Sequence, residues 1–358
     1  MRTNFELLLG ALWRIRLLSL LVVACCSSSP AQYSQTNLVS DLFEMASATD
    51  TNLMGAWGMA HSPTGPWAVT TTFGGVALMI DGTGRSLPRV VTVPQTKPIF
   101  MTGIAYNGGT GFQVAPGIPA SFIMATLNGT ILGWSASQRD PSAAVVKVNH
   151  SGTAGYGGLS LARNRGQDFL YVANFQQDRL DVFDSNFNAV AQWSGAFKDK
   201  QIAAELAPFN VQAISNLLYV TYAPTNVFSG GLGPGRGFVS VFNLDGVLIR
   251  GLQYGFWMNC PWGVVQAPAN FGHLSNRLLV GMFGSGVIAA FDPANGQFVD
   301  FLRDKNLLPL VISRGLWQLE FGNGAAAGPA DTLYFATDFQ FGVNFYGLIG
   351  TLTPARIQ

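Results

Sequence analysis

One sequence motif recurs along this chain about every fifty residues, and this period constrains the fold more than any other feature. Trp57-Gly58-Met59-Ala60 returns as Trp262-Gly263-Val264-Val265, and each is followed by apolar segments, the last of which ends in Ile80-Asp81 or Phe291-Asp292. A repeat of about this length is typical of a four-stranded propeller blade. Six such starts occur, near Trp57, Gly103, Gly158, Val211, Trp262 and Trp317. The sequence predicts an all-β fold, a six-bladed β-propeller.

The ends of the chain are expected to meet in the last blade. After Asp338 only Leu348–Leu352 has the pattern of a further strand, so this blade lacks an outer one. We expect Asn37-Leu38-Val39-Ser40 to supply it and to close the ring, because closure removes exposed sheet edges. The domain prediction is a single propeller over residues 32–358.

Charge is scarce and balanced. Only 11% of the residues are charged and the formal net charge is +1. The sequence has no basic stripe, so nucleic acid is not an expected partner.

The first residues resemble a leader. Arg14 and Arg16 precede an apolar run of about ten residues, which has the length of a signal-peptide core and is too short to span a bilayer. We predict a signal peptide over residues 1–31, a secreted or extracytoplasmic protein, and no transmembrane span in the mature chain. The alternative is a lipoprotein leader that ends before Cys25 and leaves the protein lipid-anchored through Cys25.

Several sequence segments also resemble those of a known family. They include Asn37-Leu-Val-Ser-Asp41, Trp57 to Pro66, Leu180-Asp-Val-Phe-Asp184 and Leu316 to Gly324. They are similar to an uncharacterised family of exported, NHL-like propeller proteins, some of whose bacterial members carry PEP-type C-terminal sorting signals. The resemblance implies the six-bladed fold and no established activity. No sorting signal follows Leu352.

Candidate ligand-binding residues are expected at one mouth of the central channel. Second strands end on the face where inner strands begin, so polar residues at these positions surround the same opening. Binding there would make the protein a ligand- or protein-binding module for an unknown protein, glycan or small molecule. The candidates are Asn52, Asn174, Asn210, Asn259, Arg314 and Asp338.

A calcium-dependent hydrolase of the lactonase type is the alternative at the same mouth. Ca²⁺ takes six to eight oxygen ligands, which carboxylates and amides supply. The candidate metal ligands are Asn174, Asn210, Glu320 and Asp338. Alternation in the last inner strand predicts that Gln318 and Glu320 share one face, with Trp317, Leu319 and Phe321 on the other. Turn capping by the Asn and Asp residues is the competing interpretation.

The other reactive residue types offer no clear site. His61, His150 and His273 lie in different blades without metal-ligand spacing. Cys260 has no His placed as its base, so we expect a packed, inert thiol. No cofactor is established from the sequence, Ca²⁺ is possible, and a purely structural envelope protein is a third hypothesis.

Overall fold

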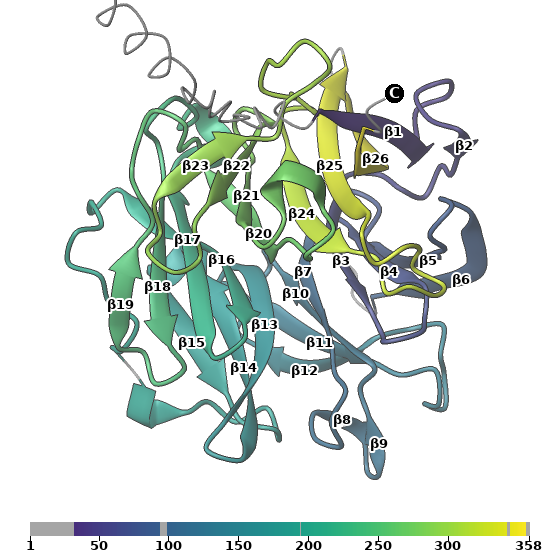
Figure 1. The fold of residues 1–358 in the computed structure, drawn as a ribbon. Coiled ribbons are helices and arrows are strands. Elements are labelled where there is room, and N and C mark those ends of the chain that lie inside the picture. The colour runs from purple at the N-terminus through teal and green to yellow at the C-terminus, as the bar shows by residue number, and fades with distance from the viewer. Residues whose placement is uncertain (1–31, 94–98, 194, 342–343, 356–358) are drawn as a thin grey trace, which may run out of the picture.

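The computed structural model describes residues 32–93, 99–193, 195–341 and 344–355. The predicted leader, with Cys25, lies outside the described residues. Six sheets surround one axis, all antiparallel except for the parallel pair of β1 and β2 at the edge of the last, and their inner strands lie around the centre of the view in Figure 1. The inner strands are β3 (Ala56–His61), β7 (Met101–Tyr106), β13 (Tyr156–Asn164), β16 (Leu206–Ile214), β20 (Pro261–Gln266) and β24 (Leu316–Phe321). The six-bladed propeller is confirmed.

The second strands are buried along most of their length because a neighbouring blade covers each face. Every residue of β10 and of β21 is buried. These strands are β4 (Trp67–Thr71), β10 (Phe122–Thr126), β14 (Gln167–Asn174), β17 (Leu217–Pro224), β21 (Leu278–Met282) and β25 (Leu333–Phe341).

Third strands complete the middle of each blade, and four blades have a separate outer strand. Blade three has only three strands, and the 3₁₀ helix η2 (Ala191–Trp193) follows its last one. The third strands are β5 (Val76–Ile80), β11 (Thr130–Trp134), β15 (Arg179–Phe183), β18 (Phe238–Asn243), β22 (Ile288–Phe291) and β26 (Asn344–Pro354). The outer strands are β6 (Ser86–Thr92), β12 (Val145–Asn149), β19 (Leu248–Gly251) and β23 (Phe298–Phe301).

Small elements lie between the blades' strands. They are the hairpin β8 (Gln113–Ala115) and β9 (Ile118–Pro119), the strand β2 (Ala48–Thr49), and the 3₁₀ helices η1 (Phe175–Gln177), η3 (Val227–Ser229) and η4 (Gly272–Leu274).

The N-terminal strand closes the ring, as predicted. Strand β1 (Tyr33–Ser40) pairs antiparallel with β26, from Tyr33 opposite Pro354 to Ser40 opposite Leu348. The Tyr33 hydroxyl donates to the Phe271 carbonyl oxygen at 2.9 Å and accepts the Leu274 backbone N–H at 3.2 Å. The first strand therefore ties blade six to blade five as well as completing its own sheet.

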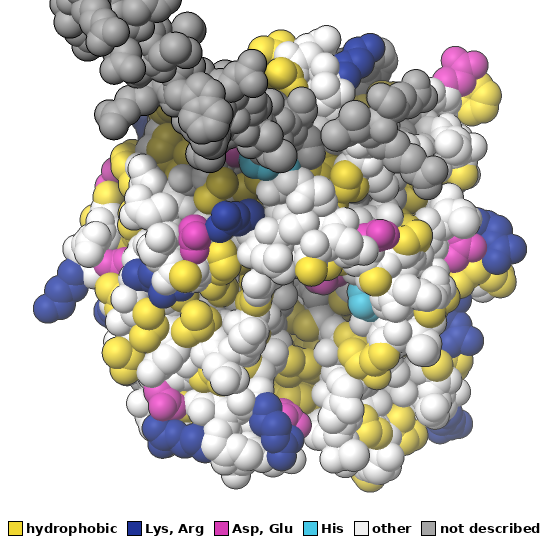
Figure 2. Space-filling model, viewed as in Figure 1, with side chains coloured by type: hydrophobic (Ala, Val, Ile, Leu, Met, Phe, Trp, Pro, Cys, Tyr) yellow, Lys and Arg dark blue, Asp and Glu magenta, His cyan; other side chains and the backbone are white. Residues whose placement is uncertain are grey.

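Six hydrophobic clusters lie between adjacent blades, one for each pair of neighbours. Among the described residues no helix is long and apolar enough to cross a membrane. On the face seen in Figure 2, charged side chains are scattered among apolar and uncharged polar ones and form no continuous band of Lys and Arg.

A β-bulge occurs near the start of every inner strand. In β24, for example, Leu316 and Leu319 are three residues apart, whereas their partners Thr337 and Phe335 on β25 are two apart. The same shift occurs in the other five inner strands. An extra residue reverses which face the following side chains occupy. The bulge therefore puts the Trp317 side chain on a different face of β24 from Leu319 and Phe321, whereas simple alternation predicts one face for all three.

Candidate functional site

The mouth predicted from the sequence is the face where the inner strands begin and the second strands end, and we call it the mouth face. An aromatic plug fills the channel there. It consists of Trp57, Phe209, Trp262, Phe283 and Trp317, all buried in one cluster.

Stacked and edge-on ring contacts hold the plug together. The Trp57 and Trp317 rings stack with centroids 3.4 Å apart, and Trp262 meets them edge-on at 5.2 and 5.0 Å. Phe209 meets Trp262 edge-on at 4.7 Å. Edge-on arrangements such as those of Trp262 and Phe209 are favourable for aromatic rings.

Blades two and three leave space for these rings because they carry small residues at the equivalent positions. Thr102 donates from its hydroxyl to the Tyr156 and Gly157 carbonyl oxygens, at 2.9 and 2.8 Å. A Cβ on Gly157 would lie 2.3 Å from the Phe209 carbonyl oxygen and 3.4 Å from the Trp262 ring. Only glycine fits at that position.

The side-chain amides of Asn174, Asn210 and Asn259 already form hydrogen bonds within the protein. Asn210 donates to the Trp262 carbonyl oxygen at 2.9 Å and accepts the Val211 N–H at 2.8 Å. Asn174 donates to Asp181 at 2.7 Å and caps η1. Asn259 accepts the Gly233 N–H at 2.9 Å. These partners lie in different blades, so the amides do not converge on one point.

Asn52 and Arg314 are exposed at the mouth face. The Asn52 amide donates to Asp50 at 3.0 Å, within its own turn. The structure therefore does not assemble the six candidates into one ring.

The two candidate carboxylates lie toward opposite ends of the channel. Glu320 pairs with Tyr334 in the register of β24 and β25, whereas Asp338 lies four residues further along β25. At about 3.3 Å per residue this is a separation of roughly 13 Å along the strand. No cluster of three or more His, Cys, Asp or Glu able to hold a metal occurs among the described residues. The four predicted metal ligands are thus not brought together.

Asp338 is buried beside the plug. Burial raises the pKa of its carboxyl to about 7, although the neighbouring Trp317 indole opposes the rise. A Cβ on Gly315 would lie 2.1 Å from Asp338 Oδ1, and Gly315 has a φ of +86°. Both facts require glycine at position 315.

We expect the free energy of unfolding to fall as the pH rises from 5 to 8. The folded Asp338 retains its proton up to a pKa of about 7, whereas its ordinary value is 3.8. Between these values the unfolded chain binds fewer protons, so raising the pH favours unfolding. Glu320, whose pKa burial also raises to about 7, acts in the same direction.

Urea unfolding of Asp338→Asn at pH 5, 6.5 and 8 tests this expectation. The neutral isostere should show a smaller loss of stability than the wild type, and Glu205→Gln, at an exposed carboxylate, should match the wild type. An equal pH dependence for Asp338→Asn would refute the assignment.

Cys260 is fully buried, and burial raises the pKa of its thiol to about 12. A thiolate is the reactive form, so the folded protein should not react with Ellman's reagent. A chain that begins at residue 32 should release one equivalent of colour only after denaturation. Fast reaction of the native protein would show that this thiol is accessible.

Four exposed phenylalanines at the mouth face have rings close to one another or to the plug, which the sequence did not reveal. Phe73, Phe100, Phe228 and Phe345 have 43%, 36%, 54% and 45% of their surface exposed. Phe73 lies 5.4 Å from Phe345 and 6.4 Å from Phe100, between ring centroids. Phe228 lies 6.2 Å from Trp57 of the plug. We call these four residues the phenylalanine group.

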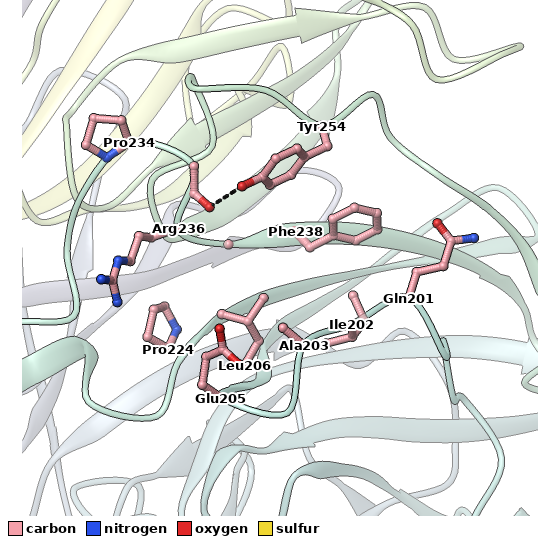
Figure 3. Close-up of a pocket in the computed structure, with 12 residues that line it drawn as sticks. Gln201, Ile202, Ala203, Glu205, Leu206, Pro224, Pro234, Arg236, Phe238 and Tyr254 are labelled. Atoms are coloured by element: carbon pink, nitrogen blue, oxygen red, sulfur yellow. Dashed lines mark hydrogen bonds between the residues drawn. The ribbon is translucent and has the colours of Figure 1, made fainter.

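A pocket of about 500 Å³ opens beside blade four, between loops of the same face. Figure 3 shows two walls, one with Pro234, Phe238 and Tyr254 and one with Pro224, Leu206 and Ile202. Tyr254 donates to the Gly235 carbonyl oxygen at 2.7 Å. The loop between β17 and β18 carries both Phe228 and the wall residue Pro234, so it joins the pocket to the phenylalanine group.

Fold and channel together define a six-bladed β-propeller whose channel is plugged at one end. The chain belongs to the family of uncharacterised proteins that includes Uncharacterized protein L690 of Acanthamoeba polyphaga mimivirus, which is 32% identical over 301 residues, 80% of this chain and 79% of the viral protein. Uncharacterized protein R648 of the same virus is 31% identical over 294 residues, 78% of this chain and 72% of that protein. No family model matches the chain.

Solved structures similar to this chain show its fold alone. A streptogramin B lyase superposes with a TM-score of 0.53 at 11% identity, over 92% of this chain and 100% of the lyase. Virginiamycin B lyase from Staphylococcus aureus gives 0.52 at 10% identity, over 90% and 99%. A Bacteroides thetaiotaomicron protein of unknown function gives 0.54 at 12% identity, over 89% and 76%.

Proposed function

We propose that this protein is an exported binding module whose mouth face holds an apolar segment of a protein partner. The proposal rests on the exposure of four phenylalanines on one face, three from loops of blades one, two and four and one, Phe345, from the start of β26 in blade six. Isolated exposed apolar residues are ordinary on protein surfaces, but a contiguous exposed patch marks an interaction site.

The chemistry of the face favours a protein segment over a glycan. Phenylalanine rings carry no group that hydrogen-bonds to sugar hydroxyls. The buried amides Asn174, Asn210 and Asn259 already have partners within the chain. The adjacent pocket adds apolar walls, with Glu205 and Arg236 among its lining residues. These features suit an extended peptide with aromatic or proline side chains.

A calcium-dependent lactonase at this mouth is not favoured. The plug occupies the axis on which metal ligands would converge, and Glu320 lies toward the opposite end of the channel from Asp338.

Export is part of the proposal, on the strength of the leader pattern. Cleavage after Ala31 would leave β1 intact, since that strand begins at Tyr33. Mass spectrometry of the protein from its native host should give Gln32 as the first residue. A lipidated chain beginning at Cys25 would instead establish the lipid-anchored alternative.

Selection of displayed random peptides on the protein, beside a glycan array, tests the binding function. We expect peptides with aromatic or proline residues to be enriched. The double variant Phe73→Ser/Phe228→Ser should weaken their binding by roughly 10- to 100-fold, as truncation of two interface aromatics does.

Val247→Ser/Ile249→Ser is the matched control. It also removes two exposed apolar side chains, at the turn into β19 on the opposite face. The control should bind as the wild type does. Enrichment of glycans alone, or equal losses in the two double variants, would reject the proposal.

A further inference from the structure

The channel holds a second cavity, at the end away from the mouth face. Its volume is about 230 Å³, roughly that of seven water molecules in the liquid. Inner strands of five blades line it. Its polar lining residues are His61, Tyr106, Ser160, Gln212, Gln318 and Glu320.

Glu320 is the one carboxylate of this cavity, and no Lys, Arg or His side chain of the described residues forms a close ion pair with it. Apart from the Phe321 backbone N–H, no donor in the described part of the chain bonds to it. Glu320 is half-buried, and a carboxylate that is partly removed from water is destabilised unless it is paired. Burial accordingly raises its pKa to about 7, and His61 opposes the rise.

His61 does not supply the missing partner, because both of its ring nitrogens face backbone carbonyl oxygens. Nδ1 lies 2.9 Å from the Ser62 oxygen and Nε2 lies 3.0 Å from the Phe321 oxygen. Carbonyl oxygens only accept hydrogen bonds, so a proton on either ring nitrogen is directed at the backbone and not at the Glu320 carboxylate. His61 therefore makes no hydrogen bond to the Glu320 carboxylate, whose oxygens keep acceptor capacity for a ligand in the cavity.

We infer that this cavity binds a small organic cation, an ammonium group on a compact apolar body, through the Glu320 carboxylate. Met59, Ile104 and Leu159 give the cavity apolar walls that suit an alkyl chain. Gln212 and Gln318 carry amide oxygens able to accept further N–H groups. A bare Ca²⁺ ion would need six to eight oxygens, and this cavity offers a single carboxylate. The inference is independent of the proposed function at the mouth face.

Thermal unfolding of the chain from residue 32 with n-butylammonium chloride at pH 8 tests the inference. n-Butanol, calcium chloride and sodium chloride at equal concentration are the comparison additives. A ligand that binds only the folded state raises the midpoint by mass action. We expect butylammonium to raise it and the other three additives not to.

Glu320→Gln should weaken butylammonium binding at least tenfold, whereas Glu44→Gln, at an exposed carboxylate that lines neither pocket, should leave it unchanged. Should Glu320→Gln fail to fold, Gln212→Leu serves instead, because it removes an acceptor from the same cavity. At pH 6 a carboxyl with a pKa of about 7 is roughly one-tenth ionised, so binding should be about tenfold weaker than at pH 8. His61 and Tyr106 are the other titratable groups lining the cavity.

Three results would each overturn the inference. The first is the absence of a butylammonium effect on the wild type at pH 8. The second is an effect that both Glu320→Gln and Gln212→Leu retain. The third is a calcium effect that Glu320→Gln abolishes while butylammonium has none, which would make the cavity a metal site.

Discussion

Deleting residues 32–45 abolishes the cooperative unfolding transition of this protein, because β1 is the strand that closes the ring. Seven residues of β1 pair with β26, and Tyr33 also bonds to two backbone groups near η4. Without β1, β26 becomes an open sheet edge and Val39, fully buried in the cluster between blades six and one, is lost. Exposed edges also promote aggregation.

Circular dichroism during thermal unfolding checks this expectation. A matched pair of point variants tests the contribution of β1 to stability without shortening the chain. Val39→Asp places a charge in the closed interface and should lower the midpoint strongly, whereas Thr36→Asp, at an exposed position of the same strand, should lower it little. A truncated chain that unfolds like the full chain would show that β1 is dispensable.

Replacing Trp317 with alanine lowers the free energy of unfolding by about 3 to 5 kcal/mol, the usual range for a buried tryptophan. Its ring is almost fully buried and contacts Trp57, Trp262, Phe209 and Phe283. No neighbouring strand can collapse into the vacated volume, since the inner strands already approach so closely that Gly157 and Gly263 leave no space for a Cβ. The cavity would therefore persist.

Urea denaturation measures this loss, with Trp257→Ala as its control. Trp257 is half-buried and stacks on Phe298 with ring centroids 4.3 Å apart, outside the plug. The control should cost clearly less than Trp317→Ala. Equal losses would mean that the plug contributes nothing beyond ordinary aromatic burial.

The fold was predictable from the sequence because its signals are local and repeated. Second strands such as Leu170–Asn174 are buried on both faces, so they appear as unbroken apolar runs. The need for a closing strand followed from the missing partner of Leu348–Leu352, and β26 does pair with β1.

The plug was not predictable in the same way, because it depends on a bulge. Alternation places Trp317 on the same face as Leu319, and only the extra residue in β24 turns it toward the axis. The recurrence of Trp57, Trp262 and Trp317 is visible in the sequence, but it fits packing between blades as well as packing on the channel axis. A bulge leaves no signature in the apolar period, so the sequence could not distinguish the two.

The hydrogen-bond partners of the candidate site residues could not be predicted from the sequence either. Asn174, Asn210 and Asn259 were chosen by strand position, but the choice of partner for an amide depends on the neighbouring blade. The exposed Phe228 had a local signal that was not used, a large apolar side chain directly before Ser229, Gly230 and Gly231. Such a residue in a glycine-rich loop is expected on the surface.

Hydrogen–deuterium exchange with the tightest selected peptide tests most directly that the mouth face is the binding surface. We expect slower exchange on binding in the segments that carry Phe73, Phe100, Phe228 and Phe345, with no change at the turn between β18 and β19. Protection confined to that turn, or to the channel end near Glu320, would contradict it.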